Sequence, residues 1–380
     1  MISDCLIDDL RRVYGSLTSS LIDAIHKPTS RLYLRVNTLY ISPGELVDRL
    51  RSGGLEVYRD QYVPEAIYVP VRGPNRVRDT GVYIYVDRFA AESLMLGANL
   101  YAPGIIRMDD FKRGEIATVK APNGLIIANV EVIVDSSRAR RMKHGLVAVN
   151  VNPLYRAPPI RDLPEYDQGL FYPQSLPAMI TVHALDPKPG ELVVDMNAAP
   201  GGKTSHIVQY TRGRARLVAF ERNNRKALQV YSTLKRLRLY INALIIPMDS
   251  RYIDTATLLI GKADRVLIDP PCTGLGVRPK ISIDKKCRDL INSYRYQRQF
   301  FTPAYRVLRR RGLLVYSTCT LTFMENEGNA SYLVEMGFEP VDLGWLPYAD
   351  RVYYGDLVAY RFNPLNPVVN GYFISVFRRA

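Results

Sequence analysis

Residues 191–211 read ELVVDMNAAPGGKTSHIVQYT: a short aliphatic strand pattern, a turn of small residues, and a helical pattern. Two glycines and their small neighbours let the backbone approach a ligand closely, and the N-terminus of the following helix offers free N–H groups. The turn is neither the dinucleotide fingerprint G-x-G-x-x-G nor the phosphate loop G-x-x-x-x-G-K-[ST], because the first glycine is missing. The stretch therefore predicts the first strand and helix of an α/β sheet, joined by a ligand-binding turn.

Alternation of strand and helix patterns continues through most of the chain that follows. The further aliphatic runs lie at 216–221, 242–249, 264–270 and 312–318. Strands that alternate with helices predict βαβ units and a doubly wound parallel sheet with both faces covered. Ligands of such sheets bind beyond the carboxyl ends of the strands.

Two further elements are expected towards the end of the chain. Residues 291–310 (INSYRYQRQFFTPAYRVLRR) have a helical pattern and predict one long helix. Residues 370–380 (NGYFISVFRRA) follow a proline-rich loop and predict a final strand at the edge of the sheet.

Acidic residues lie at or near the ends of several expected strands, namely Asp195, Glu221, Asp249 and Asp269. In doubly wound folds an acid in the position of Glu221 binds ribose hydroxyls, and Asp249 could reach an adenine amino group. Together with the glycine-rich turn, these acids favour a nucleoside ligand. The alternative is a tight packing turn with acids that cap helices in solvent.

The N-terminal half has a different organisation. Residues 1–75 combine two amphipathic helical segments with a helix and short strands, which predicts a small α+β region. Residues 76–153 contain several β patterns and one helix, which predicts a compact, mostly β module. A proline-rich linker at 152–164 leads into the third expected domain, 154–380.

Composition indicates the kind of partner. The net charge of +14, from 51 Lys and Arg against 37 Asp and Glu, favours a polyanion such as nucleic acid. An arginine-rich surface typical of thermophiles is the alternative. The chain has no apolar run long enough to span a membrane, and its N-terminus lacks the pattern of a signal peptide. We therefore expect a cytoplasmic protein with no membrane partner.

Cysteine usage separates two candidate functional thiols from two others. The four cysteines show no spacing typical of a disulfide framework or a zinc site, so we expect reduced thiols and no bound metal. Cys5 and Cys287 are expected to be inert packing residues. Cys272, in IDPPCTGLGVRP (268–279), and Cys319, in VYSTCT (315–320), follow strands expected to be neighbours. Asp269 would then lie between these two thiols and the nucleoside site.

Three long motifs carry a resemblance to a known family. DMNAAPGGKTSHI (195–207), IDPPCTGLGVRP and YSTCTLTFMENE (316–327) resemble the signature motifs of the Sun (NOP/NSUN-type) RNA cytosine-C5 methyltransferases. RVNTL (35–39) is similar to that family's N-terminal motif, and residues 80–153 resemble a PUA RNA-binding domain. The resemblance implies a Rossmann-like class I methyltransferase fold that uses S-adenosyl-L-methionine. A PUA-like domain before the catalytic domain resembles the NSUN branch that modifies tRNA on the 3′ side of the acceptor stem, at position 72, next to the 3′ CCA end.

The resemblance also implies roles for individual residues. Spacing alone does not decide which thiol attacks the base; by the resemblance, Cys319 is the nucleophile and Cys272 assists product release. Asp269 would hydrogen-bond the N3/N4 edge of the cytosine. The residues expected to touch the methyl donor are Asn197, Ala198, Ala199, Pro200, Gly201, Gly202, Lys203, Glu221, Lys226, Asp249 and Asp269. Three residues depart from the common pattern: Asn197 stands where a cysteine is frequent, the longer Glu221 where an aspartate is, and Pro270 where an alanine is.

Two alternative functions remain open at this point. One is methylation of a cytosine in rRNA, which the PUA-like module makes less favourable. The other is an inactive RNA-binding assembly factor, but both thiols, Asp269 and the glycine turn are all present. We expect a monomer that binds tRNA.

Overall fold

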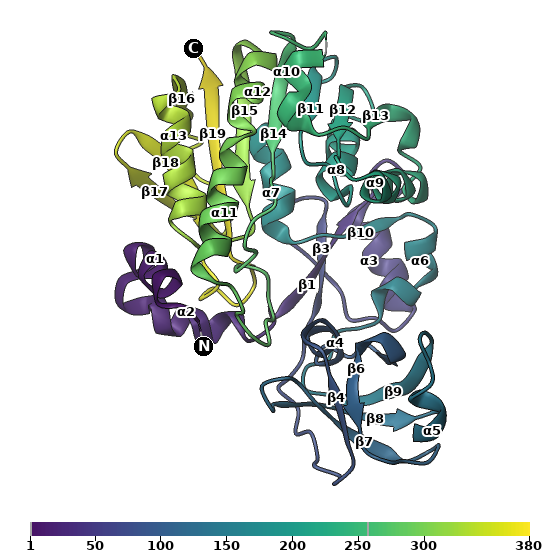
Figure 1. Ribbon diagram of the computed structural model, residues 1–380. Coiled ribbons are helices and arrows are strands. Elements are labelled where there is room, and N and C mark those ends of the chain that lie inside the picture. The colour runs from purple at the N-terminus through teal and green to yellow at the C-terminus, as the bar shows by residue number, and fades with distance from the viewer. Residues whose placement is uncertain (1, 257) are drawn as a thin grey trace.

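The computed structural model describes residues 2–256 and 258–380, and its strands form three sheets (Figure 1). A nine-stranded sheet occupies the upper part of the view and a six-stranded sheet the lower part, with a four-stranded sheet between them. Strand β19 (Tyr372–Arg379) runs upward to the C-terminus, so its antiparallel neighbour β15 (Leu308–Thr318) runs downward. The carboxyl ends of β15 and the strands parallel to it therefore face the two smaller sheets.

The nine-stranded sheet confirms the predicted doubly wound α/β fold. Its order is β13-β12-β11-β14-β15-β19-β18-β17, with β16 paired to β19, and the strands from β13 to β15 are parallel. The strands not yet given bounds are β11 (Leu192–Asp195), β12 (Arg216–Phe220), β13 (Ala243–Ile246), β14 (Ala263–Ile268), β16 (Phe338–Pro340), β17 (Asp350–Tyr354) and β18 (Leu357–Phe362). From β11, the first strand of the parallel part, the chain first builds towards β13 and then continues on the other side with β14. Ligands of such sheets bind at this reversal of strand order.

Helices cover both faces of this sheet. Adjacent residues of β11 point to opposite sides: Val193 belongs to one buried cluster and Val194 to the other. One face packs against α7 (Leu176–Leu185), α8 (Gly202–Tyr210) and α9 (Asn224–Arg236). The other packs against α10 (Ile253–Ala256), α12 (Phe301–Val307) and α13 (Asn329–Glu335). Burial on both faces explains why the strands read as continuous apolar runs.

The four-stranded sheet is antiparallel and combines distant parts of the chain. Its order is β10-β1-β3-β2, and α3 (Pro43–Ser52) packs against it. Ser42 and Glu45 form a capping box that starts α3. The strands are β1 (Arg31–Val36), β2 (Tyr58–Arg59), β3 (Ala66–Pro70) and β10 (Phe171–Pro173), and the short helix α6 (Pro164–Asp167) precedes β10. Because β10 comes from the segment that leads into the large sheet, this region is joined to the rest of the protein by backbone hydrogen bonds.

The six-stranded sheet has the order β5-β9-β8-β7-β4-β6, and its buried cluster also includes Ile281 from the loop that follows β14. Its elements are β4 (Tyr83–Val86), α4 (Arg88–Leu94), β5 (Leu100–Tyr101), β6 (Ile105–Met108), β7 (Ile116–Lys120), β8 (Ile126–Val132), α5 (Ser136–Ala139) and β9 (Leu146–Pro153). The chain enters and leaves this unit at one place, where Arg72 and Arg156 form an antiparallel bridge. The unit is thus inserted into the α/β chain at a single junction.

The N-terminal helices correct the prediction for two cysteines. Helices α1 (Asp4–Tyr14) and α2 (Thr18–Ile25) pack beside α11 (Cys287–Arg298), and Cys5 forms a disulfide with Cys287. The expectation that both were free, inert packing thiols was therefore wrong. The pairing could not be read from spacing, because the two cysteines are 282 residues apart and only the packing of α1 on α11 brings them together. Cys272 and Cys319 are free, as expected.

Two expected elements near the C-terminus also differ. The long helix over 291–310 is two helices, α11 and α12, because Pro303 lacks an N–H and its ring is tolerated only in the first turn of a new helix. Strand β19 is not an edge strand: it lies between β15 and β18. The β17–β18 hairpin, for which no prediction was made, covers that side of β19.

Short helical turns complete the structure. They are Gly15–Leu17, Ala102–Gly104, Ile160–Asp162, Tyr240–Asn242 and Ser250–Tyr252, with a π-helical turn at Met324–Gly328. Within residues 2–256 and 258–380, no helix combines the length and the apolar character needed to cross a membrane.

Candidate active site

The conformation of the glycine-rich turn after β11 is fixed by residues of the same segment. Gly201 has φ +102°, a conformation that favours glycine, and a Cβ there would lie 3.1 Å from the side chain of Thr233. Asp195 is buried and accepts hydrogen bonds from Thr204 Oγ1 at 2.7 Å and from the backbone N–H of Asn197 at 3.2 Å. Burial raises the pKa of Asp195 to about 6. Asp195 therefore fixes the conformation of the turn through these hydrogen bonds.

Arg35 ties the turn to the four-stranded sheet. Its guanidinium is fully buried and donates to the carbonyl oxygen of Gly202 at 2.6 Å and to Ser205 Oγ at 2.7 Å. A third hydrogen bond goes to Gln174 Oε1 at 2.5 Å. The RVNTL segment thus supports the start of helix α8 from outside the nine-stranded sheet.

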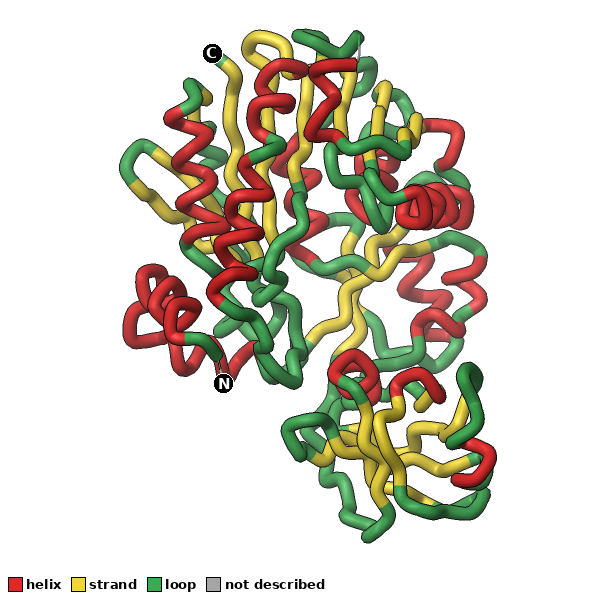
Figure 2. Tube along the Cα trace, in the orientation of Figure 1, coloured by secondary structure: helices red, strands yellow, loops and turns green. Residues whose placement is uncertain are grey.

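One pocket of about 270 Å³ collects most of the predicted site residues. Those that line it are Asn197, Ala199, Glu221, Lys226, Asp249, Asp269, Cys272 and Cys319. The remaining ones, Ala198, Pro200, Gly201, Gly202 and Lys203, do not line it; four belong to the backbone turn behind it and Lys203 reaches Asp269 from α8. The loops that follow β11, β14 and β15 meet between the large sheet and the smaller ones (Figure 2).

The two distal acids are held by different partners. Glu221 accepts a hydrogen bond from the backbone N–H of Asn223 at 3.0 Å, just after β12. Asp249 forms an ion pair with Arg251, whose Nη2 lies 2.6 Å from Asp249 Oδ2, and this hydrogen bond lowers the pKa of Asp249. Arg251 was not anticipated, since a basic residue two positions beyond a strand-end acid carries no signal of its own.

The two free thiols lie close together at the other end of the pocket. Cys272 Sγ and Cys319 Sγ are 3.3 Å apart. The hydrogen bond between them raises the pKa of Cys272 and lowers that of Cys319, and the cation of Lys203 favours a thiolate at Cys319 further. Either thiol can donate in this contact, and Cys272 becomes the donor once Cys319 is a thiolate.

Asp269 is more heavily bonded than the sequence indicated. Its Oδ2 lies 2.5 Å from Lys203 Nζ, and its Oδ1 accepts from Ser317 Oγ at 3.0 Å and Tyr372 OH at 3.2 Å. The negative charge of Asp269 raises the pKa of Lys203, so this lysine is charged. The carboxylate is therefore fixed in position and remains about a quarter exposed (26%), which leaves it open to a further donor from the pocket.

A buried glutamate positions the thiols and was missed. Glu325 accepts hydrogen bonds from the backbone N–H of Thr273 at 2.9 Å, from Thr322 Oγ1 at 2.9 Å and from Gln297 Nε2 at 2.9 Å. Thr273 Oγ1 also lies 2.6 Å from Thr320 Oγ1, which links the residues that follow Cys272 and Cys319. Glu325 lies within the third motif, but a buried carboxylate cannot be told from a solvent-exposed one by sequence.

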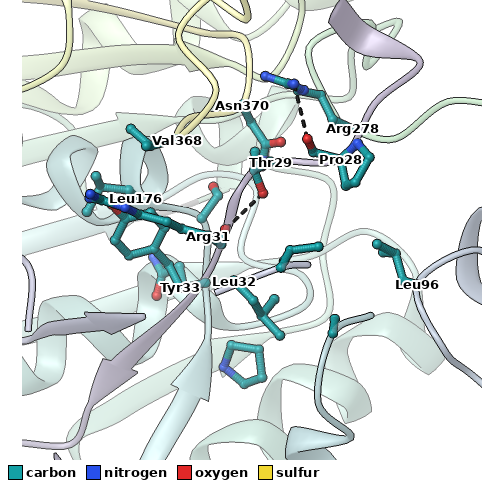
Figure 3. A pocket seen from close by; sticks show the side chains of 15 residues that line it. Pro28, Thr29, Arg31, Leu32, Tyr33, Leu96, Leu176, Arg278, Val368 and Asn370 are labelled. Atoms are coloured by element: carbon teal, nitrogen blue, oxygen red, sulfur yellow. Dashed lines mark hydrogen bonds between the residues drawn. The ribbon is translucent and has the colours of Figure 1, made fainter. Parts of the chain in front are cut away.

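A second pocket contains none of the predicted residues (Figure 3). It lies where the segment before β1 meets the loops of the large sheet. Arg278 closes one side by donating to the carbonyl oxygens of Pro28 at 3.1 Å and Pro364 at 2.8 Å. Asn370 Oδ1 and Gln174 Nε2 belong to this pocket and are buried without hydrogen-bond partners.

Comparison with protein families divides the chain into three matches. Residues 182–378 match the model of the 16S rRNA methyltransferase RsmB/F family, which is just over half of the chain. Residues 82–154 match the PUA domain, and residues 3–74 match the ferredoxin-like domain of RsmF/B-like methyltransferases. This chain belongs to the RNA cytosine-C5 methyltransferase family.

Full-length relatives support the membership. A tRNA (cytosine(72)-C(5))-methyltransferase of Pyrococcus horikoshii is 34% identical, over 98% of this chain and 96% of its own length. The human tRNA (cytosine(72)-C(5))-methyltransferase NSUN6 is 28% identical over 82% of this chain and 74% of its own length. The crystal structure of NSun6 from P. horikoshii with SFG has a TM-score of 0.93 at 33% identity, covering 99% of this chain and 98% of that one.

The pocket of this methyltransferase suits S-adenosyl-L-methionine. Asn197 Oδ1 is a buried acceptor without a partner and lines the pocket, so it is free for a donor such as an amine. Glu221 and Asp249 supply acceptors at the distal end, and Met196 and Phe300 supply apolar walls. A small ligand with one cationic and one nucleoside end fits this distribution of groups.

Changes at the distal end of the pocket, or in the glycine turn behind it, should weaken donor binding alone. We expect Asp249→Ala and Gly201→Asp to reduce the affinity for S-adenosyl-L-methionine by about tenfold or more, because one removes an acceptor and the other forces a side chain at positive φ. Isothermal calorimetry measures this effect, and RNA affinity should stay unchanged. Asp264→Ala, at the opposite end of β14 in an ion pair with Arg309, is the matched control. Unchanged donor affinity in both pocket variants would remove this site assignment.

Proposed function

We propose that this protein methylates C5 of cytosine 72 in tRNA, with S-adenosyl-L-methionine as the donor and Cys319 as the nucleophile. The observation that carries the proposal is the pair of free thiols 3.3 Å apart in the same pocket as the strand-end acids. A single thiol would suffice for attack on the base. A second thiol in hydrogen-bond contact supports a reaction that must also undo its covalent bond.

Chemistry explains why a thiol is needed. Cytosine C5 is a weak nucleophile, and adding a thiolate to C6 moves the electrons of the C5=C6 bond onto C5. When bound, S-adenosyl-L-methionine supplies an electrophilic methyl group for that carbon. Product release then requires loss of the C5 proton, re-formation of the C5=C6 bond and expulsion of the thiolate. We assign the attack to Cys319, whose pKa is lowered, and assistance of release to Cys272.

Asp269 and Lys203 would hold the base during addition. A protonated N3 is a donor, and the partly exposed carboxylate of Asp269 is an acceptor beside the thiols. Lys203 favours the thiolate at Cys319 before attack, and its ammonium group pairs with one oxygen of Asp269. Ser317 and Tyr372 fix the other oxygen, so the carboxylate costs little reorganisation when the base enters.

Recognition of tRNA would use the inserted module. We propose the division 1–75, 76–153 and 154–380, with the middle unit as a PUA domain that holds the 3′ CCA end. The single chain junction at Arg72 and Arg156 supports a distinct binding module, whose buried cluster is completed by Ile281 from the loop that follows β14. The pocket of Figure 3, lined by Arg278 from the loop that follows Cys272, offers two unpaired polar atoms for which a nucleotide could compete. We further propose that the protein acts as a cytoplasmic monomer.

A test of the product decides between tRNA and rRNA. Purified protein is incubated with S-adenosyl-L-methionine and unmodified tRNA or rRNA transcripts, and bisulfite sequencing locates protected cytosines. We expect protection at position 72 of tRNA, absent with Cys319→Ala and absent when the base is changed to uracil. Protection confined to rRNA would favour the second candidate, for which a human 28S rRNA (cytosine(4447)-C(5))-methyltransferase, 29% identical over 64% of this chain, is a relative.

The pH profile should report the charge around Cys319. The thiolate is the active form, so the single-turnover rate should fall as pH drops below the pKa of Cys319, which Lys203 helps to lower. Lys203→Met leaves Asp269 uncompensated beside the sulfur and should raise that pKa. Below the pKa, each unit of increase should slow the reaction about tenfold, and the rate should recover at high pH. Lys226→Met, at an exposed lysine of the same pocket, should leave the acid limb in place. An equal loss at every pH would mean that Lys203 acts in another way.

A further inference from the structure

Three potential metal ligands meet outside the active site. Glu65 immediately precedes β3, His183 lies on α7, and His206 lies on α8. Glu65 Oε1 lies 2.7 Å from His183 Nε2 and 2.8 Å from His206 Nε2. The ligand atoms of all three lie within 4.8 Å of one another. Because the residues come from three separate elements, only the packing of the four-stranded sheet on α7 and α8 brings them together.

The donor set suits a zinc-type cation. Two imidazoles and one carboxylate are a common ligand set for Zn²⁺, usually with water in the fourth position. Zn–N and Zn–O bonds of about 2.0–2.1 Å at a tetrahedral angle separate ligand atoms by about 3.3 Å. The two contacts of Glu65 need to widen by about 0.5 Å to reach that value, and the third separation, between the two histidines, lies within 4.8 Å. The cluster also has space for a cation and a water ligand, because its three residues line a cavity together with Gln209 and Tyr210. His183 is partly exposed (29%).

Protonation is also compatible with metal binding. Burial alone would raise the pKa of Glu65, but hydrogen bonds from His183 and His206 hold it well below its usual range. Burial lowers the pKa of His206 to about 4, so this imidazole is neutral at neutral pH.

Two buried atoms without partners point to a ligand as well. His206 Nδ1 and Gln209 Oε1 are both buried and unpaired, three residues apart on α8. Without a cation, the Nε2–H of His206 donates to Glu65 and Nδ1 is an unused acceptor. A cation on Nε2 places the ring proton on Nδ1, which then needs an acceptor of the kind that Gln209 provides. Metal binding would thus turn His206 Nδ1 into a donor that an acceptor such as Gln209 Oε1 could satisfy.

We propose that Glu65, His183 and His206 bind one divalent zinc-type cation, which fastens the four-stranded sheet to helices α7 and α8. The cation has no part in methyl transfer. It links the region that carries Arg35, the support of the glycine turn, to the helices that cover the catalytic sheet.

Cobalt and zinc test the site in the full-length chain. Since thiolates also bind these metals, the measurements use a Cys272→Ala/Cys319→Ala background after treatment with EDTA. We expect one equivalent of Co²⁺ to produce the visible d–d bands of a tetrahedral N/O site, and Zn²⁺ to displace it. Zn²⁺ should also raise the unfolding midpoint saturably at the same stoichiometry.

Single variants then locate the metal. His183→Gln, at the most exposed ligand, and the isosteric Glu65→Gln should each weaken Co²⁺ binding by at least about tenfold. His144→Gln, at an exposed histidine of the six-stranded unit, should bind as the parent does. Near-UV circular dichroism checks that each variant is folded. Absence of d–d bands in the parent, or unchanged binding in both ligand variants, would show that the cluster is a metal-free hydrogen-bond network and overturn the proposal.

Discussion

Cys319→Ala is expected to abolish methylation and to form no covalent complex with RNA. Without this sulfur nothing adds to C6, so C5 keeps its low nucleophilicity. Cys272→Ala should behave differently: attack proceeds, release stalls, and a protein–RNA adduct accumulates that survives denaturing gel electrophoresis. The lowered pKa of Cys319 and the raised pKa of Cys272 are the physical basis of this asymmetry.

Matched controls make the result specific. The double variant should form no adduct, because the trap needs the attacking thiol. Cys5→Ala/Cys287→Ala removes the disulfide on α1 and α11, far from the pocket lining, and should turn over without trapping RNA. If Cys319→Ala trapped RNA and Cys272→Ala turned over normally, the two roles would be reversed.

Deleting residues 80–153, or trimming the 3′ CCA from the tRNA, is expected to reduce methylation at least tenfold at limiting RNA. The target base must leave its stack, which costs a few kcal/mol and least at a helix end, and single-stranded ends are where proteins read RNA bases directly. The deletion is structurally reasonable because Arg72 and Arg156 already pair, and residues 73–79 are left to close the junction. Affinity for S-adenosyl-L-methionine should not change, since the donor pocket contains no residue of the module.

Salt provides the control for this prediction. Basic residues make phosphate contacts, so binding of intact tRNA should weaken steeply as salt rises. The deletion variant should retain part of that dependence through the arginines and lysines of the catalytic region. A trimmed tRNA that is methylated as fast as the intact one would show that the module reads another feature, and the ribosomal alternative would gain support.

Local patterns were sufficient for much of the fold. The strand, turn and helix at 191–211 depend on neighbouring residues alone, and each later βα unit repeats the same pattern, so the doubly wound sheet was predictable. The order of β19 was not, because a strand's neighbours depend on the β17–β18 hairpin folding back beside it. Pro303 was a visible break, but the helical periodicity on both sides of it concealed the end of α11.

The candidate site also contains residues that could be predicted from the sequence and residues that could not. Glu221, Asp249 and Asp269 follow strands of one parallel sheet, and the carboxyl ends of such strands share an edge, so their common pocket follows from sequence order. Glu325, Arg251 and Arg35 were not found, because hydrogen bonding and burial are properties of the packed protein. Their contacts hold the thiols, an acid and the glycine turn in place.

By itself, the sequence determined most of the helices and strands and the family motifs. It also showed the cysteines and the aspartate needed for attack on a base. Only the tertiary structure decided which side chains touch. It placed Cys272 3.3 Å from Cys319, joined Cys5 to Cys287, and gathered Glu65, His183 and His206 from three elements. Periodicity within a helix or strand is written in adjacent residues, whereas contacts between distant segments depend on how apolar faces pack together, which no local pattern records.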